Sequence, residues 1–245
     1  AEDLAGVGIP VLVLGAPLPD EIDDIVNSGF ISCSVPDLET ASQVNESARR
    51  AGRKAPIHVK IDTGMGRLGI PVNDAETIVE KICGFGHIRS EGIYSHFPAA
   101  GRRDRFTFGQ IRALSSLVMS LEKKGIHFQY RHIANSTATA GIPAATAAPY
   151  NMARCGIDLH GAHLSITPRP YVTSPVLTLK SRLVAIRHFP PGTTVGYGRT
   201  YRVSRKEGEL VGVVSFGYAD GYPRCLSNTG QMLVRGQRCR VVGRV

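Results

Sequence analysis

Short apolar runs alternate with amphipathic segments along the first 175 residues. The runs are rich in β-branched residues and are bounded by glycine, proline or polar residues, a pattern typical of strands. The segments between them place apolar residues three or four positions apart, as on one face of a helix. Strands are predicted over Pro10–Leu14, Phe30–Val35, Ile57–Ile61, Ile88–His96, Phe128–Ala134 and Ala153–Leu159. Helices, three of them starting at an Asp or Asn N-cap, are predicted over Asp20–Ser28, Asp37–Ala51, Asn73–Cys83 and Thr107–Lys124.

This alternation of strands and helices is typical of parallel βα units. About six units are predicted, whereas a closed barrel of this type contains eight strands. We therefore expect an α/β fold in which residues 1–175 form a partial TIM-type (β/α)8 barrel that lacks its first strands. On this count the chain begins after two βα units.

The pattern changes after Pro175, where no helical spacing is found. Turn-forming residues separate strand-like runs, which predicts an antiparallel β region. The runs are Val176–Phe189, Glu209–Tyr218, Gln231–Val234 and Arg238–Val245. We expect residues 176–245 to be the start of a C-terminal β domain. Because the last run ends without a cap or a polar tail, the chain is expected to be an internal fragment of a longer protein.

Composition narrows the class of protein. Hydrophobic residues make up 42% and charged residues 20% of the chain, as in ordinary globular proteins, and no apolar run approaches the roughly 20 residues that span a bilayer. The net charge is +9, but the arginines are dispersed without interleaved aromatic residues, so neither a membrane nor a nucleic acid is an expected partner. The five cysteines form no CxxC pair, which fits a reducing cytoplasm and argues against a zinc site.

The sharpest local motif is the glycine-rich segment that follows the third predicted strand. Lys60 and Asp62 lie at the end of that strand, and three glycines and Arg67 follow within a few residues. In βα barrels the active site is built at this end of the strands, and an arginine there offers a planar donor fork to an anion. A glycine turn with a solvated arginine is an equally good reading of the spacing alone.

Further polar clusters follow the later predicted strands, at Tyr94–Phe97, His132–Ser136 and Asn151–Ile157. Each cluster alone is weak evidence for a functional site, because a histidine is usually structural and an Asn-Ser pair is usually a helix cap. Together they favour a site for a phosphorylated ligand. A metal site is not expected, because Asp158, His160 and His163 do not share one face of a strand.

The segment His58–Ile70 resembles the KxDTGMGRxG motif of alanine racemases. The other landmarks of that family follow in order, at Tyr94–Phe97, His132–Ser136, Arg154–Gly161, Val195–Tyr201 and Gly217–Arg224. The resemblance implies a pyridoxal-phosphate (PLP) enzyme with a barrel and a C-terminal β domain. It implies interconversion of L- and D-alanine by a homodimer.

The resemblance also implies roles for single residues. Tyr201 would be the catalytic base that takes the α-proton of L-alanine, and it would reach into the partner subunit's barrel. Arg67 would bind near the PLP ring oxygen and the substrate carboxylate, held by a carbamylated Lys60, and Tyr222 would line the channel through which substrate enters. The cofactor would be held by Arg154 at the pyridine nitrogen, by His96 beside it, and by a phosphate cup of Ser136, Gly156 and Ile157.

These residue types suit racemisation. The reaction needs one base on each face of a planar carbanion, and PLP stabilises that carbanion. An arginine cannot give up its proton to the pyridine nitrogen, so PLP remains a weak electron sink. Reprotonation of the carbanion at the α-carbon is then favoured over transamination. A free tyrosine has a pKa of about 10, so Tyr201 needs nearby positive charge to act as a base.

Departures from the family pattern leave alternatives open. The lysine that anchors PLP in the family belongs to a Val-Lys-Ala-Asn-Ala-Tyr-Gly-like strand, and no such segment occurs in this chain. His160 stands where a tyrosine is usual, and Pro98 follows Phe97. A serine or broad-specificity racemase and an inactive fragment that binds PLP weakly remain possible readings. Arg154 argues against a decarboxylase, and the β region with Tyr201 argues against a single-barrel PLP-binding protein.

Overall fold

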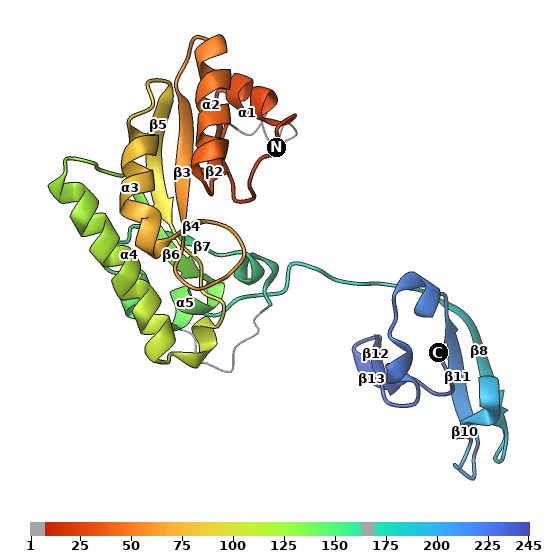
Figure 1. The fold of residues 1–245 in the computed structure, drawn as a ribbon. Helices are drawn as coiled ribbons and strands as arrows, with labels where there is room; N and C mark the ends of the chain where they lie inside the picture. Colours follow the sequence, from red (N-terminus) through yellow and green to blue (C-terminus); the bar gives the residue numbers. More distant parts are fainter. Residues whose placement is uncertain (1–7, 163–169) are drawn as a thin grey trace. The chain divides into compact units, whose positions relative to one another are not determined.

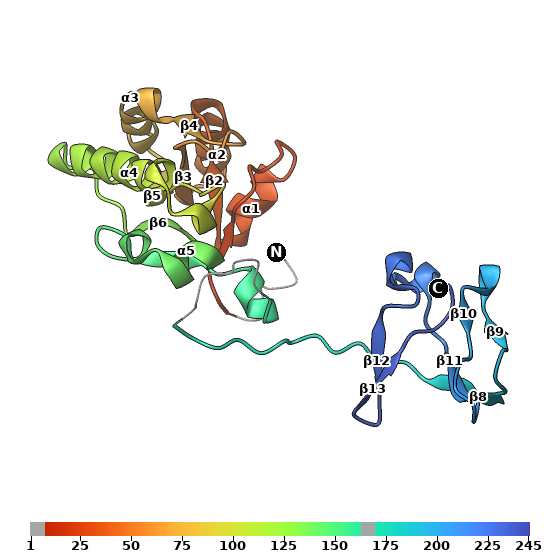
Figure 2. The ribbon, with the colours of Figure 1, turned by 90° about the horizontal axis from the view of Figure 1, so that it is seen from below.

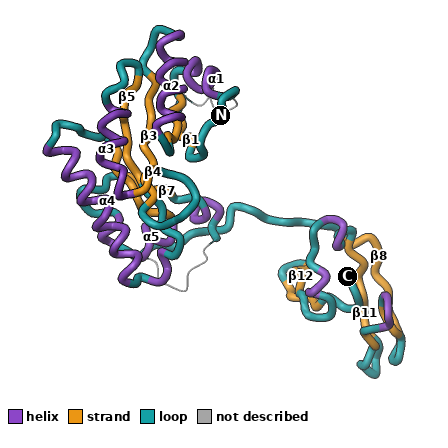
Figure 3. Tube along the Cα trace, viewed as in Figure 1, coloured by secondary structure: helices purple, strands orange, loops and turns teal. Residues whose placement is uncertain are grey.

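A computed structural model describes residues 8–162 and 170–245 of the chain. The chain divides into two compact units, residues 1–176 and 177–245, which are called unit 1 and unit 2. The α-helices of the described residues all belong to unit 1, and the helical segments coloured in unit 2 in Figure 3 are 3₁₀ helices.

Unit 1 is built on a parallel sheet with the strand order β1-β2-β3-β5-β6-β7 (Figure 1). Each strand pairs with the next one in this order, and β4 joins the sheet by pairing with β3. The sheet confirms the predicted partial barrel. The strands are β1 (Val11–Val13), β2 (Ile31–Val35), β3 (Ala55–Asp62), β4 (Ile70–Pro71), β5 (Ile88–Tyr94), β6 (Tyr130–Asn135) and β7 (Met152–Arg154).

The helices α1 to α4 lie next to one another in sequence order along the sheet (Figures 1 and 2). As predicted, Asp37 caps α2 by accepting from Thr40 N at 2.7 Å. The predicted caps Asp20 and Asn73 are wrong, because α1 follows Glu21 and α3 follows Pro71 without a side-chain cap. The helices are α1 (Ile22–Ser28), α2 (Leu38–Arg50), α3 (Val72–Cys83), α4 (Arg105–Lys123) and α5 (Ser136–Gly141).

Strand β3 shows how the sheet separates an apolar face from a polar one. Its apolar residues Ile57, Val59 and Ile61 are fully buried and belong to the core cluster that includes residues of the helices. Because side chains alternate between the two faces of a strand, His58 and Lys60 point to the opposite face. Both are also buried. The polar face of β3 therefore lies on the side of the sheet away from the apolar core.

The strand predicted over Ala153–Leu159 is wrong beyond its first residues. Strand β7 ends at Arg154, and a 3₁₀ helix covers Ile157–His160. Gly156 has φ −91° and ψ −70°, which turns the chain out of the extended conformation. Within the described residues, the other 3₁₀ helices are Ala100–Arg102, Pro143–Ala145, Tyr197–Arg199, Tyr218–Asp220 and Arg224–Leu226.

Unit 2 consists of three antiparallel pairs, as the turn signals predict. β8 (Leu183–Phe189) pairs with β11 (Glu209–Val214), β9 (Thr194–Val195) with β10 (Tyr201–Arg202), and β12 (Gln231–Val234) with β13 (Gln237–Arg240). The predicted strands are too long, because the chain enters β8 only at residue 183 and leaves β11 and β13 at residues 214 and 240. Val203 is the only buried apolar residue of unit 2 within its described residues.

Candidate active site

Polar side chains from four adjacent strands meet on the polar face of the sheet in unit 1. Lys60 of β3 is the register partner of Tyr94 on β5, and Tyr94 is the partner of His132 on β6. Arg154, the last residue of β7, pairs with Asn135 of β6. Register partners on parallel strands point to the same face, so the sheet itself gathers these groups at the carboxyl ends of its strands.

The guanidinium of Arg154 is at the centre of this cluster. Its Nη1 lies 2.5 Å from His132 Nδ1, and its Nη2 lies 3.1 Å from His96 Nδ1 and donates to the Ser95 carbonyl at 2.7 Å. Burial lowers the pKa of Arg154 to about 10, so it stays charged at neutral pH. Because a guanidinium only donates, both Nδ1 atoms accept and neither imidazole carries a second proton.

His132 extends this network to a second buried histidine. With Nδ1 accepting from Arg154, its Nε2 donates to His58 Nδ1 at 2.9 Å. Burial, followed by the charge of Arg154, lowers the pKa of His132 to about 2 and that of His58 to about 4. The same two causes lower the pKa of His96 to about 4. All three imidazoles are therefore neutral near pH 7.

A glycine makes room for His58. Gly92 is the register partner of His58, and a Cβ atom at Gly92 would lie 2.2 Å from His58 Nδ1. The imidazole crosses the missing side chain and stacks on Tyr130, with ring centroids 5.6 Å apart. Sequence reasoning placed His132 in a polar cluster of the predicted site without giving it a specific role, and it assigned no role to His58. The signal that could have found His58 is its spacing of two residues from Lys60, on the same face of β3.

Tyr94 forms an aromatic floor for the cluster. Its ring stacks on His132 at 4.7 Å, while Lys60 Nζ and Arg154 Cζ lie 4.7 and 4.9 Å from its centroid. Its hydroxyl is 2.7 Å from Ser34 Oγ and 3.2 Å from the Leu14 carbonyl, which ties the cluster to β1 and β2. Burial raises the pKa of Tyr94, so it remains a neutral phenol.

Lys60 is buried beside two other cations. Burial, then the charges of Arg154 and Arg67, lowers its pKa to about 8. Among the residues that the structure describes, Lys60 makes no hydrogen bond, and its charge is opposed only by Asp62. Arg67 itself is exposed in the loop after β3.

The glycine-rich loop is held by Asp62. This carboxylate accepts from the backbone N–H groups of Gly64 and Met65 at 2.8 Å and of Gly66 at 3.0 Å. Gly69 has φ 121°, and a Cβ atom there would lie 2.8 Å from Asp62 N. The loop therefore depends on glycine at this position, where it folds back on the end of β3.

The predicted phosphate-cup residues begin two helical turns. Ser136 is the first residue of α5 and is buried, and Asn135 caps this helix by accepting from Ala138 N at 3.0 Å. Gly156 precedes the 3₁₀ helix that starts at Ile157, and apart from its two neighbours in the chain no described residue has an atom within 4 Å of a Cβ built on it. Both turns directly follow neighbouring parallel strands, where backbone N–H groups are available to an anion.

Tyr201 and Tyr222 lie in unit 2 and are described within that unit. Tyr201 starts β10, and its hydroxyl donates to Glu209 Oε2 at 2.5 Å. This carboxylate raises the pKa of Tyr201, and the opposing charges of Arg240 and Arg205 are smaller influences. Tyr222 contacts Phe216 edge to face, with ring centroids 5.8 Å apart.

Neither a metal-binding group of side chains nor a membrane-spanning helix is found among the described residues. Within residues 8–162 and 170–245, no group of three or more His, Cys, Asp or Glu side chains is placed to hold a metal ion. His163, one member of the metal alternative, lies outside these residues. The helices of the same residues include none long and apolar enough to cross a membrane.

Comparison with known proteins covers both units. The model of the alanine racemase N-terminal domain matches residues 3–163, and that of the alanine racemase C-terminal domain matches residues 176–245. An alanine racemase from Desulforamulus reducens is 36% identical over 98% of this chain and 65% of its own length. The chain thus spans about two thirds of that relative.

Solved structures agree with the sequence matches. The alanine racemase from E. faecalis aligns with a TM-score of 0.85 and 29% identity over 100% of this chain and 65% of its own. The alanine racemase from Bacillus anthracis with bound L-Ala-P aligns with a TM-score of 0.79 and 28% identity, over 99% and 63% of the two chains. With both domain models matched in order, the chain belongs to the alanine racemase family.

Proposed function

We propose that the protein containing this chain is a PLP-dependent alanine racemase that interconverts L- and D-alanine. The observation that carries the proposal is Arg154, a half-buried cation at the end of β7. Its hydrogen-bond partners are imidazoles and carbonyl groups and include no carboxylate among the described residues. A donor of this kind beside the pyridine nitrogen favours racemisation, because it cannot supply the proton that a strong electron sink needs.

The residues present fit a phosphorylated, anionic cofactor. Lys60 is a buried cation and Arg154 a half-buried one, and neither has an ion-pair partner in the described chain. Gly156 faces open space. Ser136, Gly156 and Ile157 would hold the phosphate, and Arg154, supported by His96, would hold the pyridine nitrogen. When bound, PLP supplies an electron sink for the α-carbon of the amino acid.

Arg67 is proposed to bind the substrate carboxylate, and a carbamylated Lys60 is proposed to hold Arg67 in place. With a pKa of about 8, part of the Lys60 population is a neutral amine near neutral pH. That amine can add to CO₂ and release a proton, which leaves an anionic carbamate. A carbamate at Lys60 would offset the positive charge of Arg67 and Arg154 and would fix Arg67 in the loop.

Tyr201 is proposed as the base on one face of the substrate, supplied in a homodimer to the partner subunit's site, with Tyr222 lining the access channel. The hydrogen bond to Glu209 keeps the phenol protonated in unit 2. Tyr201 must leave Glu209 and approach positive charge before it can take a proton. The cationic cluster around Arg154 has the sign of charge that this step needs.

Alanine is the favoured substrate over serine or a broader set because the matched relatives are named alanine racemases and one was solved with L-Ala-P. The physiological role would then be supply of D-alanine for peptidoglycan. We also propose a cytoplasmic location, which agrees with five free cysteines.

The test uses the full-length protein that contains this chain, loaded with PLP. Racemisation of L-alanine and L-serine is followed by a D-amino acid oxidase assay, together with release of pyruvate. We expect kcat/KM for alanine to exceed that for serine, and Arg154→Glu to racemise more slowly while releasing more pyruvate. Absence of racemisation in the unmodified protein, or a preference for serine, would overturn the assignment to alanine.

A further inference from the structure

Helix α4 buries a glutamine at the start of its apolar face, after the buried Thr107. Gln110 is only 2% exposed, and the buried residues that follow it on the helix, Ile111, Leu114, Leu117, Val118 and Leu121, are all apolar. Burying an amide costs free energy unless its hydrogen bonds are made, so an aliphatic side chain would pack at this position with a smaller free-energy cost. Packing alone therefore does not account for a glutamine at position 110.

Those contacts reach the candidate active site. The Gln110 amide nitrogen donates to Thr63 Oγ1 at 3.1 Å and to the His96 carbonyl at 3.2 Å. Thr63 Oγ1 lies 2.7 Å from Ser95 Oγ. One side chain of α4 thus joins the loop after β3 to the segment 95–96 that follows β5.

The orientation of the amide is fixed by its neighbours. Gln110 Oε1 is a buried polar atom with no hydrogen-bond partner among the described residues. Exchanging its oxygen and nitrogen would place Oε1 against the His96 carbonyl oxygen, two acceptors with no hydrogen between them. Both amide hydrogens are therefore committed to Thr63 and His96, and the unpartnered oxygen is the cost of that arrangement.

We infer that Gln110 is a positioning residue that sets the geometry of Arg154 through Ser95 and His96. Arg154 Nη2 meets the Ser95 carbonyl at 2.7 Å and His96 Nδ1 at 3.1 Å, and the bond from Gln110 holds the backbone of His96 in place for both contacts. The inference rests on the proposed function for the role of Arg154, and it adds a residue of α4 to that site.

The experiment measures the pKa of His96 by NMR titration of its imidazole in the full chain without cofactor. In the unmodified chain that pKa is lowered to about 4 by burial and by Arg154, Lys60 and Arg67. Gln110→Met removes both donors at similar volume. We expect the pKa of His96 to rise by about one unit or more, because the imidazole moves away from Arg154 and gains water. The pKa values of His58 and His132 should stay low.

Two further variants separate positioning from simple loss of packing. Ser115→Ala removes another polar contact of α4, the 3.0 Å bond to the Tyr150 hydroxyl, and should leave His96 unchanged. Thr63→Val keeps the bond from Gln110 to the His96 carbonyl and should shift the pKa of His96 less than Gln110→Met does. If Gln110→Met does not fold, Gln110→Asn, which draws the amide back by one methylene, takes its place: a rise in the pKa of His96 supports the inference and no rise overturns it. An unchanged His96 in folded Gln110→Met, or an equal shift in Ser115→Ala, also overturns it. The pKa of His96 is measured without PLP and without turnover. An inactive protein would therefore refute the proposed function but would not change the outcome of this experiment.

Discussion

The two units of the chain differ in what their strands bury. In unit 1 the strand residues Val35, Ile57 and Val59 are fully buried in the apolar core. In unit 2 the paired strands β8 and β11 leave Ile186 and Leu210 62% and 74% exposed. A two-stranded antiparallel pair is marginal in water unless another layer covers it. Unit 1 can therefore hold a precise polar site by itself, whereas the strands of unit 2 need contacts beyond those within the unit.

The chemistry of the two units differs in the same way. Unit 1 holds the titratable groups of its candidate site buried or half-buried, linked by the network through Arg154 and His132 and shifted in pKa. Unit 2 holds Tyr201, its proposed base, near the surface beside Glu209. The difference suggests that unit 1 binds and orients the ligand, whereas unit 2 supplies the proton acceptor.

The largest expected effect tests this division. Tyr201→Phe in the full-length protein should slow exchange of the α-proton of L-alanine by about 10²–10⁴-fold, the usual size of a general-base contribution. Exchange of D-alanine should fall less, because the other face uses another base. The measurement is deuterium incorporation from D₂O into each enantiomer. Equal losses for both enantiomers would show that Tyr201 is not specific to one face.

The difference in burial gives the next prediction. Leu114 of α4 is fully buried, so Leu114→Ala should lower the free energy of unfolding by about 2–5 kcal/mol. Ile186→Ala in unit 2 should lower it by less than about 1 kcal/mol, since that side chain is already largely exposed. Urea titration followed by circular dichroism measures both. A cost for Ile186→Ala as large as that for Leu114→Ala would contradict the contrast between the units.

The buried histidines predict a loss of stability in acid. His58, His96 and His132 have pKa values of about 4, 4 and 2 in the folded chain, below the ordinary value of about 6.5 in the unfolded chain. The unfolded state therefore binds more protons below pH 6.5, and stability should fall as pH drops from about 6.5 towards 4. Each unit of pKa shift corresponds to roughly 1.4 kcal/mol.

The control for this pH dependence is a matched histidine. His132→Asn should flatten the dependence of unfolding free energy on pH between about 6.5 and 4, whatever its effect on stability at pH 7. His127→Asn replaces an exposed histidine of the same unit and should leave the slope unchanged. A slope unaffected by His132→Asn would mean that His132 is not the group held neutral by folding.

Local pattern predicted the parts of the site that lie within one element. Alternation along β3 placed Lys60 and Asp62 at the end of a strand, and the glycines placed a loop after it. It failed for Ala153–Leu159, because a short apolar run does not distinguish a strand from a helical turn. The network joining His58, His132 and Arg154 could not be predicted, since it depends on the register of three strands distant in sequence.

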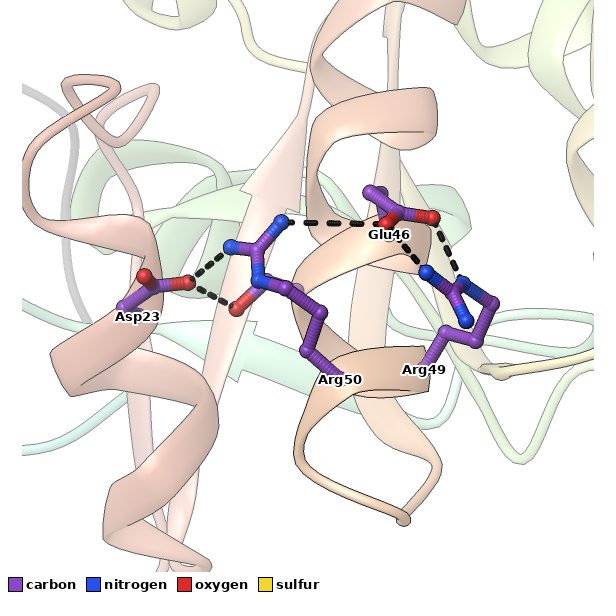
Figure 4. Close-up of polar contacts among 5 residues, drawn as sticks. Asp23, Glu46, Arg49 and Arg50 are labelled. Atoms are coloured by element: carbon purple, nitrogen blue, oxygen red, sulfur yellow. Dashed lines mark hydrogen bonds and ion pairs between the residues drawn. The ribbon is translucent and has the colours of Figure 1, made fainter.

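The smallest expected effect lies on the outer surface of unit 1, where charged side chains join α1 to α2 (Figure 4). Arg50 contacts Asp23 at 2.7 Å and Glu46 at 3.9 Å, while Glu46 also pairs with Arg49 at 2.7 Å. These side chains are about half exposed, so water and salt screen their attraction.

Arg50→Ala should therefore lower the free energy of unfolding by less than about 1 kcal/mol, and 1 M salt should reduce the difference further. Urea titration at low and high salt measures it, with Arg49→Ala as the matched control on the same helix. Among the residues that the structure describes, Arg49 pairs only within α2, so its replacement leaves the link between the helices intact and should cost less than Arg50→Ala. A cost for Arg50→Ala similar to that of Leu114→Ala would show that this surface network, and not the apolar face beneath it, holds α1 on unit 1.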